Sequence, residues 1–405
     1  MGTAGGAGGW TERNDCLLQE NDRGRRVHGS FIVFQRVSRM NLIAQLYAGL
    51  PDHDFPARQA REYMAFGQNE GFFHLAVAKD MRIQTLREHF ARTGLRKVYL
   101  SANLAGFECA IEGIDVEVLE KNFFQEADPA RRLAKKVQLG GSIVIINNND
   151  AGSAESREAY ASFFMECEAT FFVAWDWDNH HWLELSPFLA AYSDCYAPAH
   201  HENLYLLSRY NWRIAGPIYC SSVQWPRKFL EAHLPEMLNA ERIDAPLGMH
   251  IPYSTFSFRM QMITTLNQYY PSIGFSSHAF HGRTPADRMR EWCSHKTHWI
   301  APVLNDVPIR IFDALVTGGI PIVPESLRFL PPVNRIPREF IAFYSATDIV
   351  QPQDCVARAN GLFDAGGREG MVARHKLALQ HYHGDTSVRR MLGYAAEVLD
   401  IQVPQ

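Results

Sequence analysis

The 405-residue sequence lacks paired cysteine motifs, a long apolar run and an excess of charge of either sign. Its seven cysteines lie far apart and none belongs to a C-x-x-C pair, which disfavours a zinc ribbon or a disulfide framework and favours reduced thiols. No uninterrupted apolar stretch approaches the roughly 20 residues that a membrane-spanning helix needs. The formal net charge is -4, from 40 basic and 44 acidic side chains, which argues against a dedicated nucleic-acid binder.

The N-terminal residues 1–29 also lack the basic segment and apolar run of a secretory signal peptide. Their glycine-rich, charged composition predicts a flexible leader. We therefore expect a soluble, cytoplasmic protein with no integral membrane span. Peripheral association with the inner face of the cytoplasmic membrane stays open at this point.

The sequence does contain short apolar runs that alternate with helical patterns. Residues 30–35, 142–146 and 169–175 are typical of buried strands, and residues 157–167 are typical of a helix. This alternation predicts an α/β fold with parallel sheets. At roughly 100–200 residues per domain, the length favours two domains. We predict an N-terminal α/β domain at 30–220, a C-terminal Rossmann-like domain at 221–370 and a helical segment at 371–405.

The clearest strand–helix–strand pattern lies between residues 303 and 326. It predicts a helix over 307–317, with Asp306 as N-cap, Pro308 in the first turn and Gly318-Gly319 at the C-terminal end. The N-terminus of such a helix favours phosphate, and Arg310 could add a bidentate contact. A well-capped core helix without a ligand is the alternative interpretation. Further candidates for a donor-binding edge are Asn305, Asp313, Ser276, Ser277, His278, Glu325 and Ser345.

A second group of polar residues follows the strands predicted in the N-terminal half. Asp176, Asp178, His180 and His181 come directly after one buried strand. Carboxylates in a D-x-D pattern could hold a divalent cation, and Asp with His could bind a transition metal or act as a base with an acid partner. The alternative interpretation is a polar loop whose histidine side chains are hydrogen-bonded and have no functional role. Nearby strand ends contribute candidate acceptor-binding residues: Asn149, Asp150, His200 and His201.

The segment RIFDALVTGGIPIVPES, residues 310–326, resembles the C-terminal donor-site element of GT-B glycosyltransferases. The similarity extends over about residues 270–350, and Asp313 stands where that family usually has Glu. It implies two Rossmann-like domains facing across a cleft, with a C-terminal helix that crosses back. It also implies a nucleotide-sugar donor (CMP-, UDP-, GDP- or TDP-linked) bound by the C-terminal domain, and no required metal or other cofactor.

The DWDNHH loop together with GGIPIVP is similar to bacterial surface-polysaccharide transferases, including Kdo transferases that use CMP-sugars. This resemblance implies that Asp178 or Asp176 is a nucleophile or base, with His180 or His181 as its partner. The expected function is transfer of a sugar to a glycan or glycolipid acceptor, in lipopolysaccharide or related polysaccharide biosynthesis. Two other functions remain open: a metal-dependent hydrolase or lyase built on the Asp/His loops, and a non-catalytic protein that binds nucleotides or carbohydrates.

Overall fold

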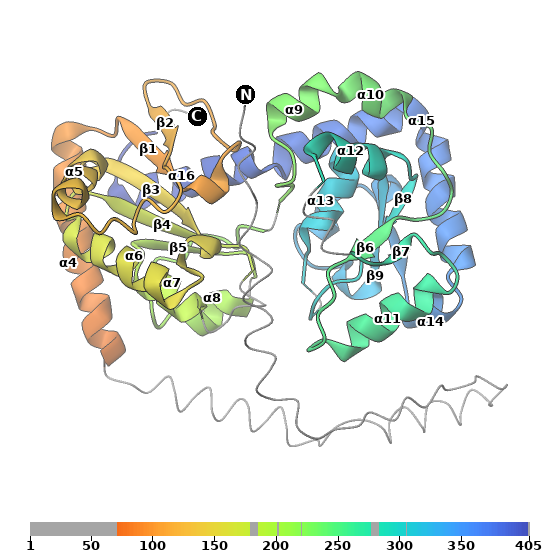
Figure 1. The fold of residues 1–405 in the computed structure, drawn as a ribbon, viewed down its shortest axis with the longest axis horizontal. Coiled ribbons are helices and arrows are strands. Elements are labelled where there is room, and N and C mark those ends of the chain that lie inside the picture. Colours follow the sequence, from red (N-terminus) through yellow and green to blue (C-terminus); the bar gives the residue numbers. More distant parts are fainter. Residues whose placement is uncertain are drawn as a thin grey trace, which may run out of the picture. The chain divides into compact units, whose positions relative to one another are not determined.

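The computed structural model describes residues 71–178, 185–200, 202–219, 221–276, 283–304 and 306–403. The expected leader at 1–29 and the strand expected at 30–35 lie outside these residues. Phe72–Gln405 form one compact unit, and Figure 1 shows helices and strands alternating along it. The α/β class expected from the sequence is confirmed.

The first sheet consists of five strands in the order β2-β1-β3-β4-β5, and every neighbouring pair is parallel. Every residue of β3 and β4 is buried, as expected from their continuous apolar sequences. Both strands were predicted, each within two residues of its observed limits. The strand bounds are β1 Lys97–Leu100, β2 Asp115–Val118, β3 Ser142–Asn147, β4 Phe171–Asp176 and β5 Cys195–Pro198.

Helices cover both faces of this sheet (Figure 1). Apolar side chains of α4 and α16 pack against one face, and those of α5, α6, α7 and α8 pack against the other. Short 3-10 turns η1 and η2 follow β1 and β3 directly. The bounds are α4 Gly71–Thr93, η1 Ala102–Leu104, α5 Pro129–Leu139, η2 Asn148–Ala151, α6 Ala154–Glu166, α7 Ser186–Ala191, α8 Glu202–Leu207 and α16 Gly384–Leu399.

The second sheet is also parallel and is built from two groups of strands, β10-β9-β8 and β6-β7. Leu247 joins the groups, because its N–H donates to Thr297 at 2.9 Å and its carbonyl accepts from the Trp299 N–H at 2.8 Å. The resulting strand order is β7-β6-β8-β9-β10, so β6 and β8 lie side by side. The bounds are β6 Gly248–His250, β7 Ile273–Phe275, β8 Thr297–Trp299, β9 Ile320–Pro324 and β10 Ala342–Tyr344.

The second sheet is likewise covered by helices on both faces. One core contains side chains of α9, α10, α12, α13 and the end of α15, and the other contains side chains of α11, α14 and the first part of α15. The bounds are α9 Arg227–Ala232, α10 Leu234–Asn239, α11 Ser257–Asn267, α12 Pro285–Cys293, α13 Ile309–Val316, α14 Ala346–Val350 and α15 Gln353–His381.

The helical segment expected at 371–405 belongs to two helices, α15 and α16. It breaks at Tyr382 and His383, and α16 starts afresh at Gly384. The side chain of His383 accepts from the Asp385 N–H and so caps the new helix. Val388, Met391 and other apolar residues of α16 then join the core of the first sheet. The chain therefore returns from the second sheet to the first.

Within the described ranges, no helix is long and apolar enough to cross a membrane. The five cysteines in those ranges are buried and form no disulfide with one another. The domain boundaries given above stay predictions.

Candidate functional site

The carboxyl ends of β3, β4 and β5 lie together at one edge of the first sheet. Parallel pairing sets Asn147 opposite Trp175 and Asp176 opposite Pro198. The polar residues that follow these strands therefore share that edge, as expected from the sequence. Asp194, by contrast, precedes β5 and lies at the opposite edge, where it pairs with Arg82 at 2.7 Å.

Asp176 is completely buried at the end of β4. Its Oδ2 accepts a hydrogen bond from the Tyr196 hydroxyl at 2.7 Å. Burial raises the pKa of this carboxyl to about 7, and hydrogen bonds from Ser186 and Tyr196 act in the opposite direction. Asp176 thus joins β4 to β5 and α7 inside the fold.

Asp178 lies two residues further on and is only partly buried. Its Oδ2 accepts a hydrogen bond from Nδ2 of Asn148 at 3.3 Å. Burial raises the pKa of Asp178 to about 6, while the bonds from Asn148 and Trp177 favour the charged form. Of the two aspartates, Asp178 is the one that retains access to solvent.

The turn after β3 holds its own polar groups in place. Asp150 accepts from the Asn147 N–H at 2.8 Å through Oδ2 and from Asn103 Nδ2 at 2.6 Å through Oδ1. Burial nevertheless raises the pKa of Asp150. Asn149 is partly buried and donates its backbone N–H to Oδ1 of Asn147 at 3.1 Å. Oδ2 of Asp150 therefore holds the turn after β3, and Oδ1 connects this turn to η1.

The histidines of the two candidate loops are only partly described. His200 follows β5 at the same edge and is partly buried. His180, His181 and His201 lie outside the described residues.

At the second sheet, two helices begin at the carboxyl edge without a side-chain cap. α11 follows β6 and α13 follows β8, and these strands are neighbours in the sheet. In the described chain, neither helix has a capping side-chain hydrogen bond or an acidic residue in its first turn. The partial positive charge of both N-termini is therefore not met by a side chain of their own first turns.

Each of these first turns carries an arginine. Arg259 of α11 donates Nε to Ala301 at 3.0 Å and Nη1 to Ile251 at 2.8 Å, and Arg310 of α13 donates Nη1 to the Met249 carbonyl. All these acceptors are backbone carbonyls. Among the described ion pairs, none joins either guanidinium to a carboxylate.

The two guanidinium groups also repel each other. Burial lowers the pKa of Arg310 to about 10, and the charge of Arg259 adds to that shift. Burial lowers the pKa of Arg259 in the same way. Two desolvated cations at two uncapped helix ends form a site that an anion would stabilise. Arg259 was not among the site residues predicted from the sequence, because no sequence pattern links residue 259 to residue 310.

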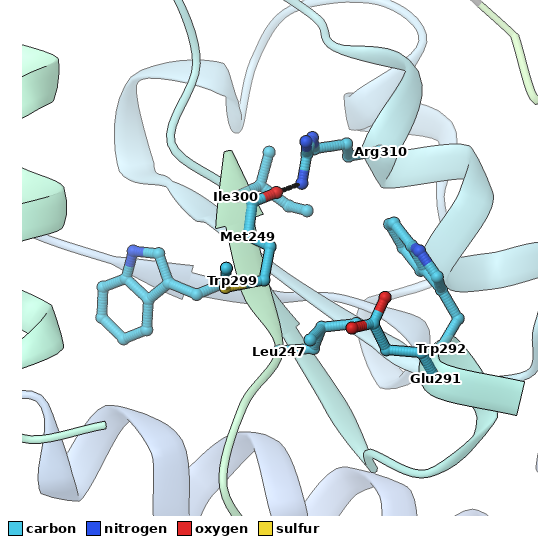
Figure 2. A pocket seen from close by; sticks show the side chains of 7 residues that line it. All are labelled: Leu247, Met249, Glu291, Trp292, Trp299, Ile300 and Arg310. Carbon is cyan, nitrogen blue, oxygen red and sulfur yellow. Dashed lines mark hydrogen bonds between the residues drawn. The ribbon is translucent and has the colours of Figure 1, made fainter. Parts of the chain in front are cut away.

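A small cavity lies beside Arg310, between β6, β8 and α12 (Figure 2). Figure 2 shows the bond from Arg310 to the Met249 carbonyl at this cavity, with the Glu291 carboxylate and the Trp292 ring on the α12 side. The lining side chains are Leu247, Met249, Glu291, Trp292, Trp299, Ile300 and Arg310.

Asp306 is not the N-cap of α13, contrary to expectation. The helix starts at Ile309, and Pro308 occupies the N-cap position. Oδ1 of Asp306 instead accepts from the Val303 N–H at 2.6 Å and fixes the loop after β8. Burial raises the pKa of Asp306 to about 7, although the bond from Val303 opposes this shift. α13 therefore begins without a side-chain cap.

Asp313, in the middle of α13, is completely buried. It accepts from Ser222 Oγ at 2.9 Å and from Gln224 Nε2 at 2.6 Å. Burial raises its pKa to about 6, against the effect of these two bonds. In this structure its carboxylate binds the segment that leads into α9, and Asp313 lies on the inner side of the helix.

The other described donor-site candidates follow β7, β9 and β10. Ser276 follows β7 and donates its N–H to the His250 carbonyl at 2.8 Å. Glu325 is exposed and pairs with Arg328. Ser345 is exposed and forms a capping box with Asp348 after β10, at the end of the sheet. Asn305, Ser277 and His278 lie outside the described residues.

Within the described ranges, no group of three or more His, Cys, Asp or Glu side chains is arranged to hold a metal ion.

No family model and no curated protein matches this chain. Similar solved structures include an α,α-trehalose-phosphate synthase (UDP-forming) from Burkholderia vietnamiensis, with 10% identity, 76% of this chain and 100% of that chain covered, and a TM-score of 0.41. An α,α-trehalose 6-phosphate synthase from Burkholderia multivorans has 10% identity, 77% and 99% coverage, and a TM-score of 0.35.

Proposed function

We propose that this chain is a GT-B-type glycosyltransferase that uses a nucleotide-sugar donor. The observation that carries the proposal is the pair Arg259, which is buried, and Arg310, which is partly buried, in the first turns of two uncapped helices at one sheet edge. A nucleoside diphosphate or monophosphate presents the anion that such a site favours. The resemblance of residues 310–326 to the GT-B donor-site element supports the same assignment.

In the proposed reaction, the donor phosphate binds Arg259, Arg310 and the N-terminal ends of α11 and α13. When the bond between the sugar carbon and the phosphate oxygen breaks, the electron pair stays on that oxygen. The two guanidinium groups stabilise the negative charge that develops there. In this arrangement, arginine side chains and helix N-termini stabilise the leaving phosphate.

The acceptor side of the reaction is assigned to the first sheet. Asp178 accepts the proton of an acceptor hydroxyl while the new bond from that oxygen to the sugar carbon forms. Its raised pKa, about 6, leaves it mostly ionised at pH 7 and basic enough for this role. Attack by Asp178 on the donor sugar itself is the other role that the sequence resemblance implies. Asn149 and His200 at the same edge are the proposed acceptor contacts.

The finer assignment is also a proposal. We propose an acceptor that is a glycan or glycolipid of a bacterial surface polysaccharide, with CMP-Kdo among the donors to be tested. The sequence resemblance described above supports it.

The proposed donor site is tested by measuring melting temperature and calorimetric binding with UDP, GDP, TDP, CMP and their sugar conjugates. A ligand that binds the native state raises its melting temperature by mass action. We expect at least one nucleotide to bind, and Arg259→Gln and Arg310→Gln each to weaken it about tenfold or more, as expected for loss of a charge-assisted contact. Arg290→Gln is the matched control, because Arg290 is exposed and pairs with Asp287.

Two results would contradict the proposal. One is that no nucleotide or sugar conjugate in the panel binds. The other is that a nucleotide binds equally well to the Arg259→Gln and Arg310→Gln variants. Stoichiometric transition metal together with hydrolysis of the substrate would favour the hydrolase alternative, and binding without turnover in any acceptor screen would favour a non-catalytic protein.

A further inference from the structure

Asn148 is a buried polar residue that contacts Asp178, the proposed base. It is 1% exposed and lies in the turn η2, immediately after β3. Its Nδ2 donates to Oδ2 of Asp178 at 3.3 Å and to Oδ1 of Asn149 at 3.3 Å. Its Oδ1 accepts from the Trp177 N–H at 3.3 Å and from Nδ2 of Asn147 at 2.9 Å. Both N–H groups and the carbonyl oxygen of this amide are therefore in use.

Backbone groups determine which end of this amide faces Asp178. The Trp177 N–H can only donate, so the atom of Asn148 that faces it must be the oxygen. Asn147 is oriented in the same way, because its Oδ1 accepts from the Asn149 N–H at 3.1 Å and its Nδ2 donates to the Trp175 carbonyl at 3.2 Å. A flipped amide at Asn148 would place its Nδ2 against the Trp177 N–H and Nδ2 of Asn147. It would also place its Oδ1 against the Asp178 carboxylate. The donor end of Asn148 is thus fixed towards Asp178.

We propose that Asn148 is a positioning residue, whose amide holds Oδ2 of Asp178 and so orients this carboxylate as the base that receives the acceptor proton. This inference rests on the proposed function, since it takes Asp178 as the base. The amide follows β3 and the carboxylate follows β4, so a bond between the segments after two neighbouring strands fixes the base. A base held in one orientation meets the acceptor hydroxyl without first losing side-chain freedom.

The hydrogen bond also changes the acidity of the carboxyl. A donor to a carboxylate favours its charged form, and here it opposes the effect of burial on the pKa of Asp178. Loss of the amide must therefore raise the pKa of Asp178. A residue with a purely structural role in the turn would not produce this change.

The test measures the pKa of Asp178 directly, by carbon-13 NMR of its labelled carboxyl group, with Asp178→Asn to assign the resonance. In Asn148→Ala we expect a rise of roughly half to one unit, the size expected for loss of one hydrogen bond to the charged form. In Asn148→Asp we expect a larger rise, because a second carboxylate replaces the donor. This second variant keeps an oxygen for Trp177 and Asn147, so it preserves the shape of the turn.

Asn211→Ala is the matched control. Asn211 is equally buried, and its Nδ2 donates to the carbonyls of Ala190 at 3.1 Å and Ser193 at 2.9 Å. Loss of its side chain should lower stability without moving the pKa of Asp178. An unchanged pKa in both Asn148 variants, or an equal change in Asn211→Ala, overturns the inference.

Kinetics with a donor and acceptor found in the panel complete the test. We expect kcat of Asn148→Ala to fall about tenfold or more while the donor KM changes less than about twofold, with the acid limb of the pH profile moved to higher pH. A wild-type pH profile in that variant overturns the inference even if the chain is a glycosyltransferase. A raised pKa in a protein that transfers no sugar supports the bond from Asn148 and overturns the proposed function instead.

Discussion

Oδ1 of Asp313 accepts a hydrogen bond from Oγ of Ser222 at 2.9 Å, inside the protein. This bond connects the helix that carries Arg310 to the segment leading into α9. The structure thus uses the acidic residue of the GT-B-like motif for an internal contact. The consequence for stability can be measured, because the pKa of Asp313 is raised to about 6.

Asp313→Asn should change how stability depends on pH. A carboxyl with a raised pKa in the folded state binds its proton more tightly there than in the unfolded chain. Its contribution to stability is therefore present below the unfolded pKa of about 3.9 and is lost as pH rises towards about 6. The melting temperature of Asp313→Asn, relative to wild type, should rise from pH 4 to pH 7.

Asp287→Asn is the control for this measurement. Bonds from Thr284 lower the pKa of Asp287, so the sign of its contribution is opposite. A relative melting temperature of Asp313→Asn that stays flat or falls over the same range would contradict the assignment of Asp313 as a buried acid.

Gly318 ends α13 with a φ of +75°, as expected for the residue after a helix C-cap. A Cβ at this position would also lie 3.2 Å from Cβ of Met371. We expect Gly318→Ala to destabilise the protein by roughly 1–2 kcal/mol, measured by urea unfolding. Gly361 lies inside α15 with open space around it, so Gly361→Ala should instead stabilise by roughly 0.5–1 kcal/mol. Equal effects at both sites would refute this explanation.

Arg374 is a buried cation that supports the same helix end. Its Nε donates to the Gly318 carbonyl at 2.9 Å, and its guanidinium lies 5.2 Å from the Phe363 ring centroid. Arg374→Ala should cost roughly 2–4 kcal/mol, because it removes a buried side chain and leaves a helix carbonyl without its donor. Arg328→Ala, at a partly exposed position on the surface, should cost less than about 1 kcal/mol. Equal losses in chemical denaturation would argue against a capping role for Arg374.

Asp178→Asn and Asp176→Asn should separate catalysis from structure. Asp178→Asn should lower turnover about a hundredfold or more with donor binding unchanged, because the base is lost. Asp176→Asn keeps an oxygen for the Tyr196 hydroxyl, so turnover should fall less than about tenfold. The measurement is single-turnover sugar transfer together with calorimetric donor binding. A greater loss in Asp176→Asn than in Asp178→Asn would reverse the assignment of the two aspartates.

Much of the fold could be predicted because it depends on local patterns. The continuous apolar runs that became β3 and β4 have no polar face, so only a strand buried on both sides suits them. The alternation of such runs with helices implied parallel pairing, which in turn brought Asp176, Asp178 and the turn at 147–150 to one edge. The break at Tyr382 was missed, because helical periodicity continues on both sides of it.

Less of the site could be predicted. The sequence suggested two equivalent aspartates in D-x-D, and it suggested Asp306 as a helix cap. The structure buries Asp176 under Tyr196, leaves Asp178 accessible and turns Asp306 towards Val303. These outcomes depend on which neighbours surround each carboxyl, and residue spacing does not encode this.

The sequence by itself determined the α/β class, the parallel strands and the polar loops at their ends, because hydrophobic periodicity and helix-end residues act over a few neighbours. Only the tertiary structure decided that Arg259 lies near Arg310, because 50 intervening positions separate them in the chain. The hydrogen bonds of Leu247 with Thr297 and Trp299 set β6 beside β8 and bring their helices together. The tertiary structure likewise decided the orientation of Asn148 towards Asp178. Burial and hydrogen-bond partners set the charge and direction of these groups, and both are properties of the assembled fold.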